Sequence, residues 1–93
     1  MAGSTAGLEV KRVIKYDGNG SLRAFCDVEV GNAVLVRGVK VVEGSKGLFV
    51  SMPREQGKNG QWYDTVSPVT KDIRKHLSEL VLDAYSNAHR TQQ

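Results

Sequence analysis

The strongest constraint on the fold is an alternation of side-chain types over residues 21–30, SLRAFCDVEV. A period of two residues is the signature of a strand, because successive side chains point to opposite faces of the sheet. Turn-forming residues flank the segment, DGNG at residues 17–20 and Gly31-Asn32 after its end. The glycine-first pair is typical of a type II′ hairpin turn. The alternation predicts a half-buried strand whose inward face carries Leu22, Ala24, Cys26, Val28 and Val30.

Four further segments have strand character, and together they predict an antiparallel β-meander of about five strands. Gly38, inside the third strand, indicates a bulge or a close backbone approach. Pro53 cannot donate a hydrogen bond within a sheet, so the fourth strand is expected to stop there or to lie at an edge. Asn59-Gly60 is a strong hairpin signal that leads into the fifth strand. The four segments are residues 8–16, 33–42, 48–52 and 61–66.

One amphipathic helix is predicted after the strands, which places the domain in the α+β class. Thr70 is the expected N-cap, because its hydroxyl can accept a hydrogen bond from a free amide of the first turn. The helix is expected to end near Asn87, and Leu82 is expected on its solvent face, opposite the apolar stripe. The stripe consists of Ile73, Leu77, Leu80, Val81 and Ala84.

The length of 93 residues suits one domain, which we expect at residues 8–88. Residues 1–7, MAGSTAG, are interpreted as a disordered leader, and residues 89–93 as a flexible tail. Cys26 is the only cysteine, and a lone thiol fits a reducing compartment. The sequence shows neither a signal peptide nor an apolar run near the roughly 20 residues of a membrane span. A cytoplasmic protein without membrane contact is therefore expected.

The reactive side chains form no enzyme motif, so we expect no catalytic activity, no metal and no cofactor. Cys26 lies on the apolar face of its strand, where a buried structural role is far more common than a nucleophile. His76 and His89 lack the spacing of metal ligands. Asp27 and Glu29 share a strand face and could resemble a catalytic carboxylate pair, but such a pair on the open side of a sheet is far more often a solvated surface. The glycines at positions 18, 20, 31, 44, 47, 57 and 60 lie in turns between strands and open no helix, so no phosphate loop is predicted.

The charge balance is mildly basic, with 13 Lys+Arg against 10 Asp+Glu and a formal net charge of +3. Lys71, Arg74 and Lys75 fall in the first turn and a half of the helix, although the partial positive charge of a helix N-terminus favours acids there. One interpretation is that exposed cations cost little and are tolerated. The other is a phosphate-binding site that combines these cations with the free amides of the first turn.

A polar loop, residues 54–60, follows the fourth strand and contributes two more cations, Arg54 and Lys58. Trp62 and Tyr63 come directly after the loop. Neighbouring residues of a strand point to opposite faces, so one ring is expected to enter the core and the other to stand exposed. An exposed ring beside a basic loop would suit stacking on a nucleic-acid base. The alternative is that both rings cover a small core.

The segment VKVVEGSKGLFVSMP at residues 39–53, followed by NGQWYD and SPV, resembles the stage V sporulation protein G family over most of the chain. The resemblance implies a small bacterial regulator of septation and sporulation that binds DNA or RNA. It also implies a homodimer formed through sheet edges. Basic residues after Met52-Pro53 and at the start of the helix are implicated in binding. Together with the cations singled out above from the charge pattern, the candidate nucleic-acid-binding residues are Arg54, Lys58, Lys71, Arg74 and Lys75.

Two main functional hypotheses follow, and an enzyme without a recognisable motif remains a third and weaker one. In the first, the chain is a dimeric nucleic-acid-binding regulator whose loop and helix start together contact phosphates. In the second, it is a protein-interaction module of the division machinery, in which Leu82 and a sheet edge contact another protein and the basic residues only aid solubility.

Overall fold

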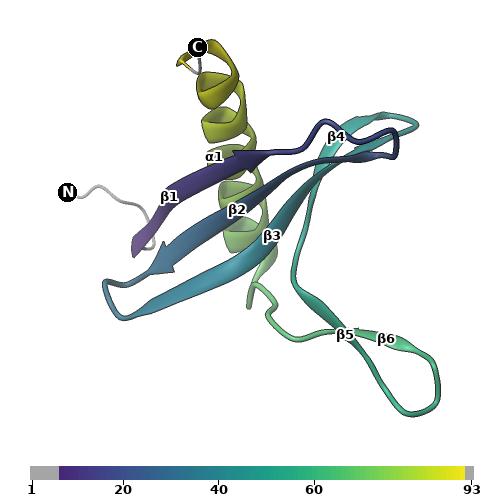
Figure 1. The fold of residues 1–93 in the computed structure, drawn as a ribbon. Helices are drawn as coiled ribbons and strands as arrows, with labels where there is room; N and C mark the ends of the chain where they lie inside the picture. Colours follow the sequence, from purple (N-terminus) through teal and green to yellow (C-terminus); the bar gives the residue numbers. More distant parts are fainter. Residues whose placement is uncertain (1–6, 92–93) are drawn as a thin grey trace.

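A four-stranded antiparallel sheet and one long helix form the body of the protein, and a separate two-stranded ribbon projects from it (Figure 1). The computed structural model describes residues 7–91, with side chains as far as residue 88. The sheet has the order β1-β2-β3-β4, and the ribbon pairs β5 with β6. The α+β class is confirmed. The elements are β1 (Leu8–Lys15), β2 (Leu22–Val30), β3 (Val34–Gly44), β4 (Gly47–Ser51), β5 (Arg54–Gln56), β6 (Trp62–Asp64) and α1 (Lys71–Thr91).

The two ends of the described chain differ from the expected leader and tail. Residues 1–6 of the leader and residues 92–93 of the tail lie outside the described residues. Gly7 is tied to the sheet, because its carbonyl oxygen accepts a hydrogen bond of 2.7 Å from the backbone N–H of Gly31. Residues 89–91 continue α1, which therefore runs beyond the predicted end near Asn87.

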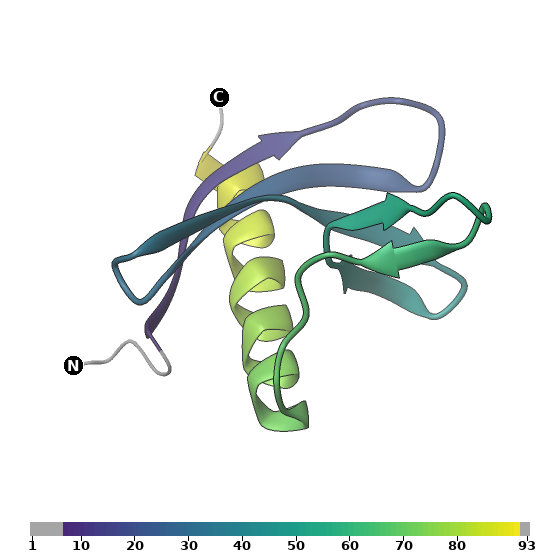
Figure 2. The ribbon, with the colours of Figure 1, turned by 90° about the horizontal axis from the view of Figure 1, so that it is seen from below.

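The inner face of the sheet, which α1 covers, is the face that the alternation predicts. Ala24, Cys26 and Val28 are buried there, in one cluster with Leu77 and Val81 of the helix. Val30 is an exception and is 38% exposed. The reason is that α1 crosses the sheet obliquely, so the β2–β3 hairpin extends past the helix (Figure 2).

Irregular pairing changes which side chains share a face. Gly38 has a φ of 87° and lies where two residues of β3 stand opposite one residue of β2, so the predicted bulge is confirmed. A second shift in β2 pairs Leu22 with Val42. Val42 follows the buried Val41 and points to the other face. Leu22 therefore belongs to the outer face of the sheet, in contrast to the prediction.

The turn between β2 and β3 is also of a different kind from the one predicted. Gly31 and Asn32 both have a φ of 59°, and the backbone N–H of Ala33 donates a 3.0 Å hydrogen bond to the carbonyl oxygen of Val30. A type II′ turn has a positive φ only at its first central residue, whereas a type I′ turn has it at both. Asparagine tolerates the left-handed region better than most residues, which makes this geometry accessible.

The β5–β6 ribbon replaces both the expected loop and the expected fifth strand of the meander. Arg54–Gln56 pairs with Trp62–Asp64 rather than with the sheet. Thr65 closes the base of the ribbon, since its N–H and its hydroxyl donate to the carbonyl oxygen of Pro53 at 2.9 and 3.2 Å. At the tip, Gly60 has a φ of 84° and its N–H donates to Gly57 at 3.0 Å. The predicted hairpin is thus present, with Gly60 in the conformation that glycine adopts most easily.

The start of α1 and most of its apolar stripe are as predicted, but the expected position of Leu82 is wrong. Thr70 caps the helix, because its Oγ1 accepts a 3.1 Å hydrogen bond from the backbone N–H of Ile73. The buried face centres on Leu77 and Val81. Leu82 lies about 100° from Val81, and it packs half-buried against the core. Leu82 is therefore not a free apolar residue on the solvent face. In the described residues, no helix is long and apolar enough to cross a membrane.

Thr70→Ala is expected to lower the free energy of unfolding by about 1 kcal/mol, because the amide of Ile73 loses its partner. Thr70→Ser keeps the hydroxyl and should retain most of that stability. The comparison is made by urea denaturation followed by circular dichroism. Equal stabilities for the alanine and serine variants would show that the cap contributes nothing.

Candidate nucleic-acid interface

The ribbon holds two of the predicted cations in different surroundings. Arg54 opens β5 and stands opposite Asp64 in the ribbon register, with its Nε 3.2 Å from the carboxylate Oδ1. Both side chains are exposed, so the pair offsets the charge of Arg54 without burying it. Lys58 lies at the exposed tip and forms no ion pair with any other described residue. Lys58 is therefore the freer of the two cations.

Both aromatic rings of the ribbon are exposed, so the expectation that one of them enters the core is wrong. Trp62 is 57% exposed and Tyr63 is 48% exposed. Tyr63 has a structural role at the tip, because its hydroxyl donates to Oδ1 of Asn59 at 3.2 Å. Its ring also lies so close to Gly57 that a Cβ there would come within 2.6 Å of it. Among the described residues, none makes a polar contact with the side chain of Trp62, whose indole is available to a second molecule.

The start of α1 brings together the other three predicted cations. Lys71, Arg74 and Lys75 are all exposed, and none forms an ion pair with another described residue. Asp72 is the one acidic residue of the first turn. The Thr70 cap satisfies the amide of Ile73, which leaves the earlier amides of the helix directed outward. The arrangement can hold a phosphate through cations and backbone N–H groups together.

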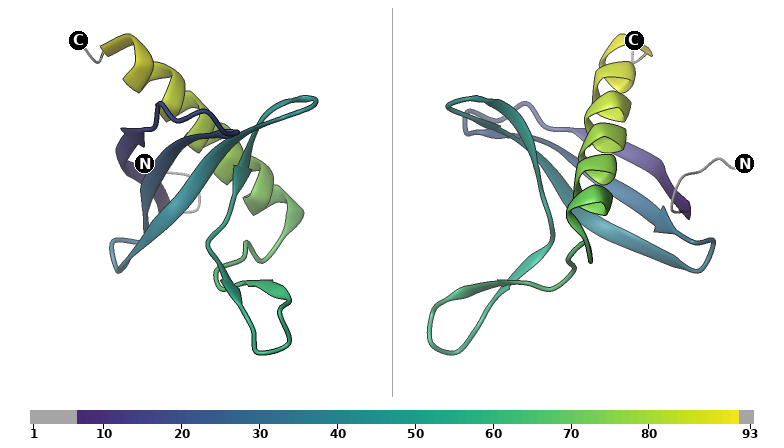
Figure 3. Two further views of the ribbon diagram at one scale, coloured as in Figure 1. Left: turned by 45° about the vertical axis from the view of Figure 1, so that its right-hand side comes forward. Right: turned by 180° about the vertical axis from the view of Figure 1, so that it is seen from behind.

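The two basic groups are separate in space, in contrast to the expected single site. Residues 65–70 connect the base of the ribbon to the start of α1, and the tip leads away from the helix in every view (Figures 1 and 3). Lys58 therefore extends the basic surface outward, and Arg54 lies between the tip and the body. A ligand that contacts both groups must be extended, as a nucleic-acid strand is.

The outer face of the sheet carries an apolar group that sequence reasoning did not single out. Ile14 stands opposite Phe25, and Val42 stands opposite Phe49, in pairs across neighbouring strands. Ile14 and Phe49 are 44% and 49% exposed. The sequence does contain a signal for this group, because Phe25 interrupts the polar residues on the outward face of the alternating segment 21–30. The β1 and β4 strands form the two edges of this sheet.

The side chains usual in catalysis form no reactive group in the described part of the chain. Cys26 is 1% exposed. Burial, aided by the charge of Asp27, raises the pKa of its thiol from 9.0 to about 11, so the nucleophilic thiolate is scarce at neutral pH. Among the described residues, no three His, Cys, Asp or Glu side chains gather in a way that could hold a metal ion.

Comparison with known proteins identifies the family. The family model SpoVG matches residues 8–87. A protein of Archaeoglobus fulgidus named "Putative septation protein SpoVG" is 45% identical over 74 residues, which cover 80% of this chain and 87% of that protein. A protein of the same name from Heliobacterium modesticaldum is 42% identical over 77 residues, covering 83% of this chain and 86% of that protein. With the matched region running from the first strand of the sheet to the last turns of the helix, the chain belongs to the SpoVG family.

Proposed function

We propose that this chain is a nucleic-acid-binding regulator with a role in septation, and that it acts as a dimer. The relatives are named as septation proteins, which supports the cellular role. The observation that carries the molecular activity is the set of four exposed, unpaired cations on the ribbon tip and the first turns of α1. These are Lys58, Lys71, Arg74 and Lys75.

The proposed mechanism is recognition of the phosphate backbone. The free amides and the three cations at the start of α1 hold one phosphate group, and Lys58 contacts the strand further along. Arg54 can exchange its Asp64 partner for a phosphate, because both groups are exposed. None of these contacts reads a base, so the mechanism predicts strong salt dependence and modest sequence preference.

Dimerisation makes a weak basic surface effective. A net charge of +3 per chain is modest, and two copies would double it. The unpaired edge of β4 and the apolar outer face beside it are the surfaces that a sheet-mediated dimer would use. Two or three cations per subunit would then engage about 4–6 phosphates.

The decisive experiment is fluorescence anisotropy with labelled duplex DNA, single-stranded DNA and single-stranded RNA at low and near-physiological salt. Lys58→Glu/Arg74→Glu is expected to weaken binding at least tenfold and to reduce the salt slope by about 0.7–0.9 for each lost phosphate contact. The reason is that both reversals remove cations from the proposed interface.

The matched control is Arg12→Glu/Arg37→Glu, which changes the net charge equally on parts of β1 and β3 that do not pair with β4. Both of these arginines are exposed. The control should weaken binding only slightly. Equal losses in the two variants would show that net charge alone matters, and folded protein that does not bind even at low salt would refute the proposal.

A further inference from the structure

We propose that an open apolar pocket between the sheet and α1 is the docking site for Trp62 on the ribbon of a second copy of this chain. The inference deepens the proposed function, because it names the contact that joins the two subunits. The observations behind it are the pocket, its exposed rim and the projecting ribbon.

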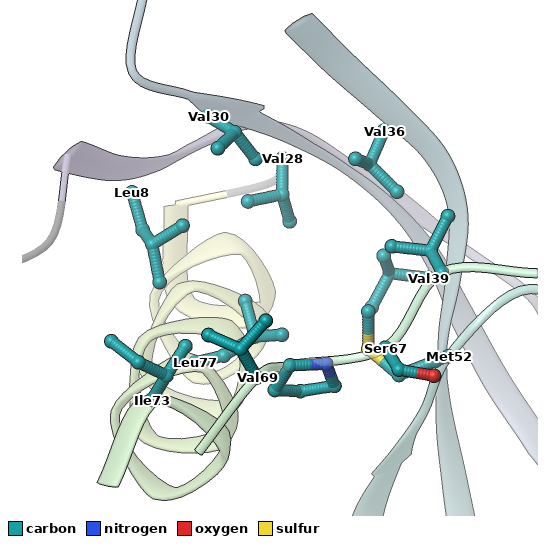
Figure 4. A pocket seen from close by; sticks show the side chains of 12 residues that line it. Leu8, Val28, Val30, Val36, Val39, Met52, Ser67, Val69, Ile73 and Leu77 are labelled. Carbon is teal, nitrogen blue, oxygen red and sulfur yellow. The ribbon is translucent and has the colours of Figure 1, made fainter.

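The pocket lies where the helix leaves part of the inner sheet face uncovered (Figure 4). It has a volume of about 320 Å³. Val28, Val36 and Val39 line it from the sheet, and Ile73 and Leu77 line it from α1. Ser67 is the single polar residue in the lining. A ligand that needs oriented hydrogen bonds would find almost none here, so the pocket suits a bulky apolar group.

The rim of the pocket is apolar and exposed. Val30 and Val69 belong to the lining and are 38% and 89% exposed, and Val34, the pairing partner of Val30, is 57% exposed. Val69 precedes the N-cap, a position that often packs against the fourth residue of the helix. Here that residue is Arg74, which is exposed. The rim therefore presents apolar surface that none of the residues the structure describes covers.

The same chain supplies one side chain with the right shape and position. Trp62 stands on a ribbon that projects from the body (Figure 3). The other exposed aromatic residues are less suited. Phe49 lies within a strand of the sheet, Tyr63 is held at the ribbon tip, and the ring of Tyr16 lies against Gly18. Residues 1–6, MAGSTA, contain no large apolar side chain other than Met1. A second copy is therefore the occupant that the chain itself favours.

Symmetry makes the contact reciprocal. In a two-fold dimer each ribbon reaches the other subunit, so two tryptophans fill two pockets. The position of the ribbon is also compatible with pairing at the sheet edge, because β5 follows the edge strand β4 after only Met52 and Pro53. A partner placed along β4 would lie next to the ribbon. The docked indole would then be unavailable for stacking on a base.

Trp62 is the only tryptophan, so intrinsic fluorescence reports directly on its surroundings. The emission maximum should lie at shorter wavelength in concentrated protein and should shift to longer wavelength on dilution, with an increase in acrylamide quenching. Analytical ultracentrifugation of the same samples should show dimer dissociating over the same concentrations. A dimer with a fully solvated tryptophan would overturn the proposal.

Variants separate this contact from other interfaces. Trp62→Ser should weaken the dimer at least tenfold in ultracentrifugation, whereas Trp62→Phe should retain much of the affinity. Phe49→Ser removes a comparably exposed aromatic ring from the outer sheet face and tests the competing contact there. A larger loss in Phe49→Ser than in Trp62→Ser would place the dimer contact on the outer face instead.

A disulfide provides a positional test. Trp62→Cys combined with Val69→Cys should give a covalent dimer under mild oxidation, and neither single variant should do so as efficiently. Failure of this cross-link in a chain that remains dimeric and binds nucleic acid would overturn the docking proposal and leave the proposed function intact. Tryptophan quenching by single-stranded RNA, without burial on self-association, would instead assign Trp62 to the nucleic-acid interface.

Discussion

Val81→Asp is expected to unfold the protein at room temperature. Val81 is 0% exposed and lies at the centre of the helix face that packs on the sheet. An aspartate there must bury a carboxyl group without a partner, since no buried polar or charged residue is present among the described residues. Together with the lost apolar contacts, the cost exceeds about 4 kcal/mol. That is a large part of the roughly 5–15 kcal/mol that stabilises a typical domain.

Circular dichroism and urea denaturation test this expectation, with two aspartate variants on the same helix for comparison. Ser86→Asp introduces the same charge at an exposed position and should leave the unfolding midpoint nearly unchanged. Leu82→Asp should fall between the two, because Leu82 is half-buried against the core. A folded Val81→Asp protein with the midpoint of the parent would mean that the helix does not pack on the sheet as described.

The behaviour of Leu82 also bears on the protein-interaction hypothesis. That hypothesis expects Leu82→Asp to abolish a partner contact while the fold is unaffected. Because Leu82 packs against the core, the substitution reports on stability first. A partner-binding experiment with this variant must therefore be preceded by a stability measurement.

The inner face of the sheet could be predicted because its signal is long and regular. Ala24, Cys26 and Val28 recur every second residue, and burying any of them requires burying all three. Leu22 and Val30 mark the limits of such reasoning. A register shift turns Leu22 outward, and the oblique helix leaves Val30 uncovered. Both effects arise from how strands and helix pack together, and neither can be recognised in the alternation of side chains along β2.

The ribbon could not be predicted because its strands are short and entirely exposed. Each has three residues, and none of the six is buried. The hairpin signal at Asn59-Gly60 was present, but the choice of pairing partner was decided by Pro53 and Thr65 at the base. An alternation of side chains predicts a buried face only where one face of the strand packs on a core. Neither face of the ribbon does, so the exposure of Trp62 depends on where the ribbon lies in the fold.

In the candidate site, too, the grouping of cations along the helix could be predicted from the sequence, whereas contacts that depend on the ribbon could not. Lys71, Arg74 and Lys75 could be grouped from helix spacing, and they are indeed exposed on the same two turns. The ion pair between Arg54 and Asp64 depends on ribbon register, which joins residues ten apart. The separation of the ribbon tip from the helix likewise depends on the direction in which the ribbon leaves the body.

Cys26 should make the stability of the protein depend on pH in the alkaline range. Burial holds the pKa of the folded thiol at about 11, against 9.0 for a free thiol, and the charge of Asp27 adds to this effect. Between these values the unfolded chain releases the thiol proton while the folded chain keeps it. The stability associated with the neutral thiol is therefore complete below about pH 9 and is lost as the pH rises toward about 11.

The expected loss is about 2–3 kcal/mol, since each pKa unit corresponds to about 1.4 kcal/mol. Lysines and tyrosines also titrate in this range, so the measured quantity must be the difference in unfolding free energy between the parent and Cys26→Ala, determined by urea denaturation in anaerobic buffers. The parent should be the more stable protein near pH 8, because alanine leaves a small cavity. The difference in unfolding free energy should become smaller as the pH rises, until Cys26→Ala is the more stable protein. A constant difference across the range would mean that the folded thiol titrates as freely as the unfolded one, and hence that water reaches the centre of the inner sheet face.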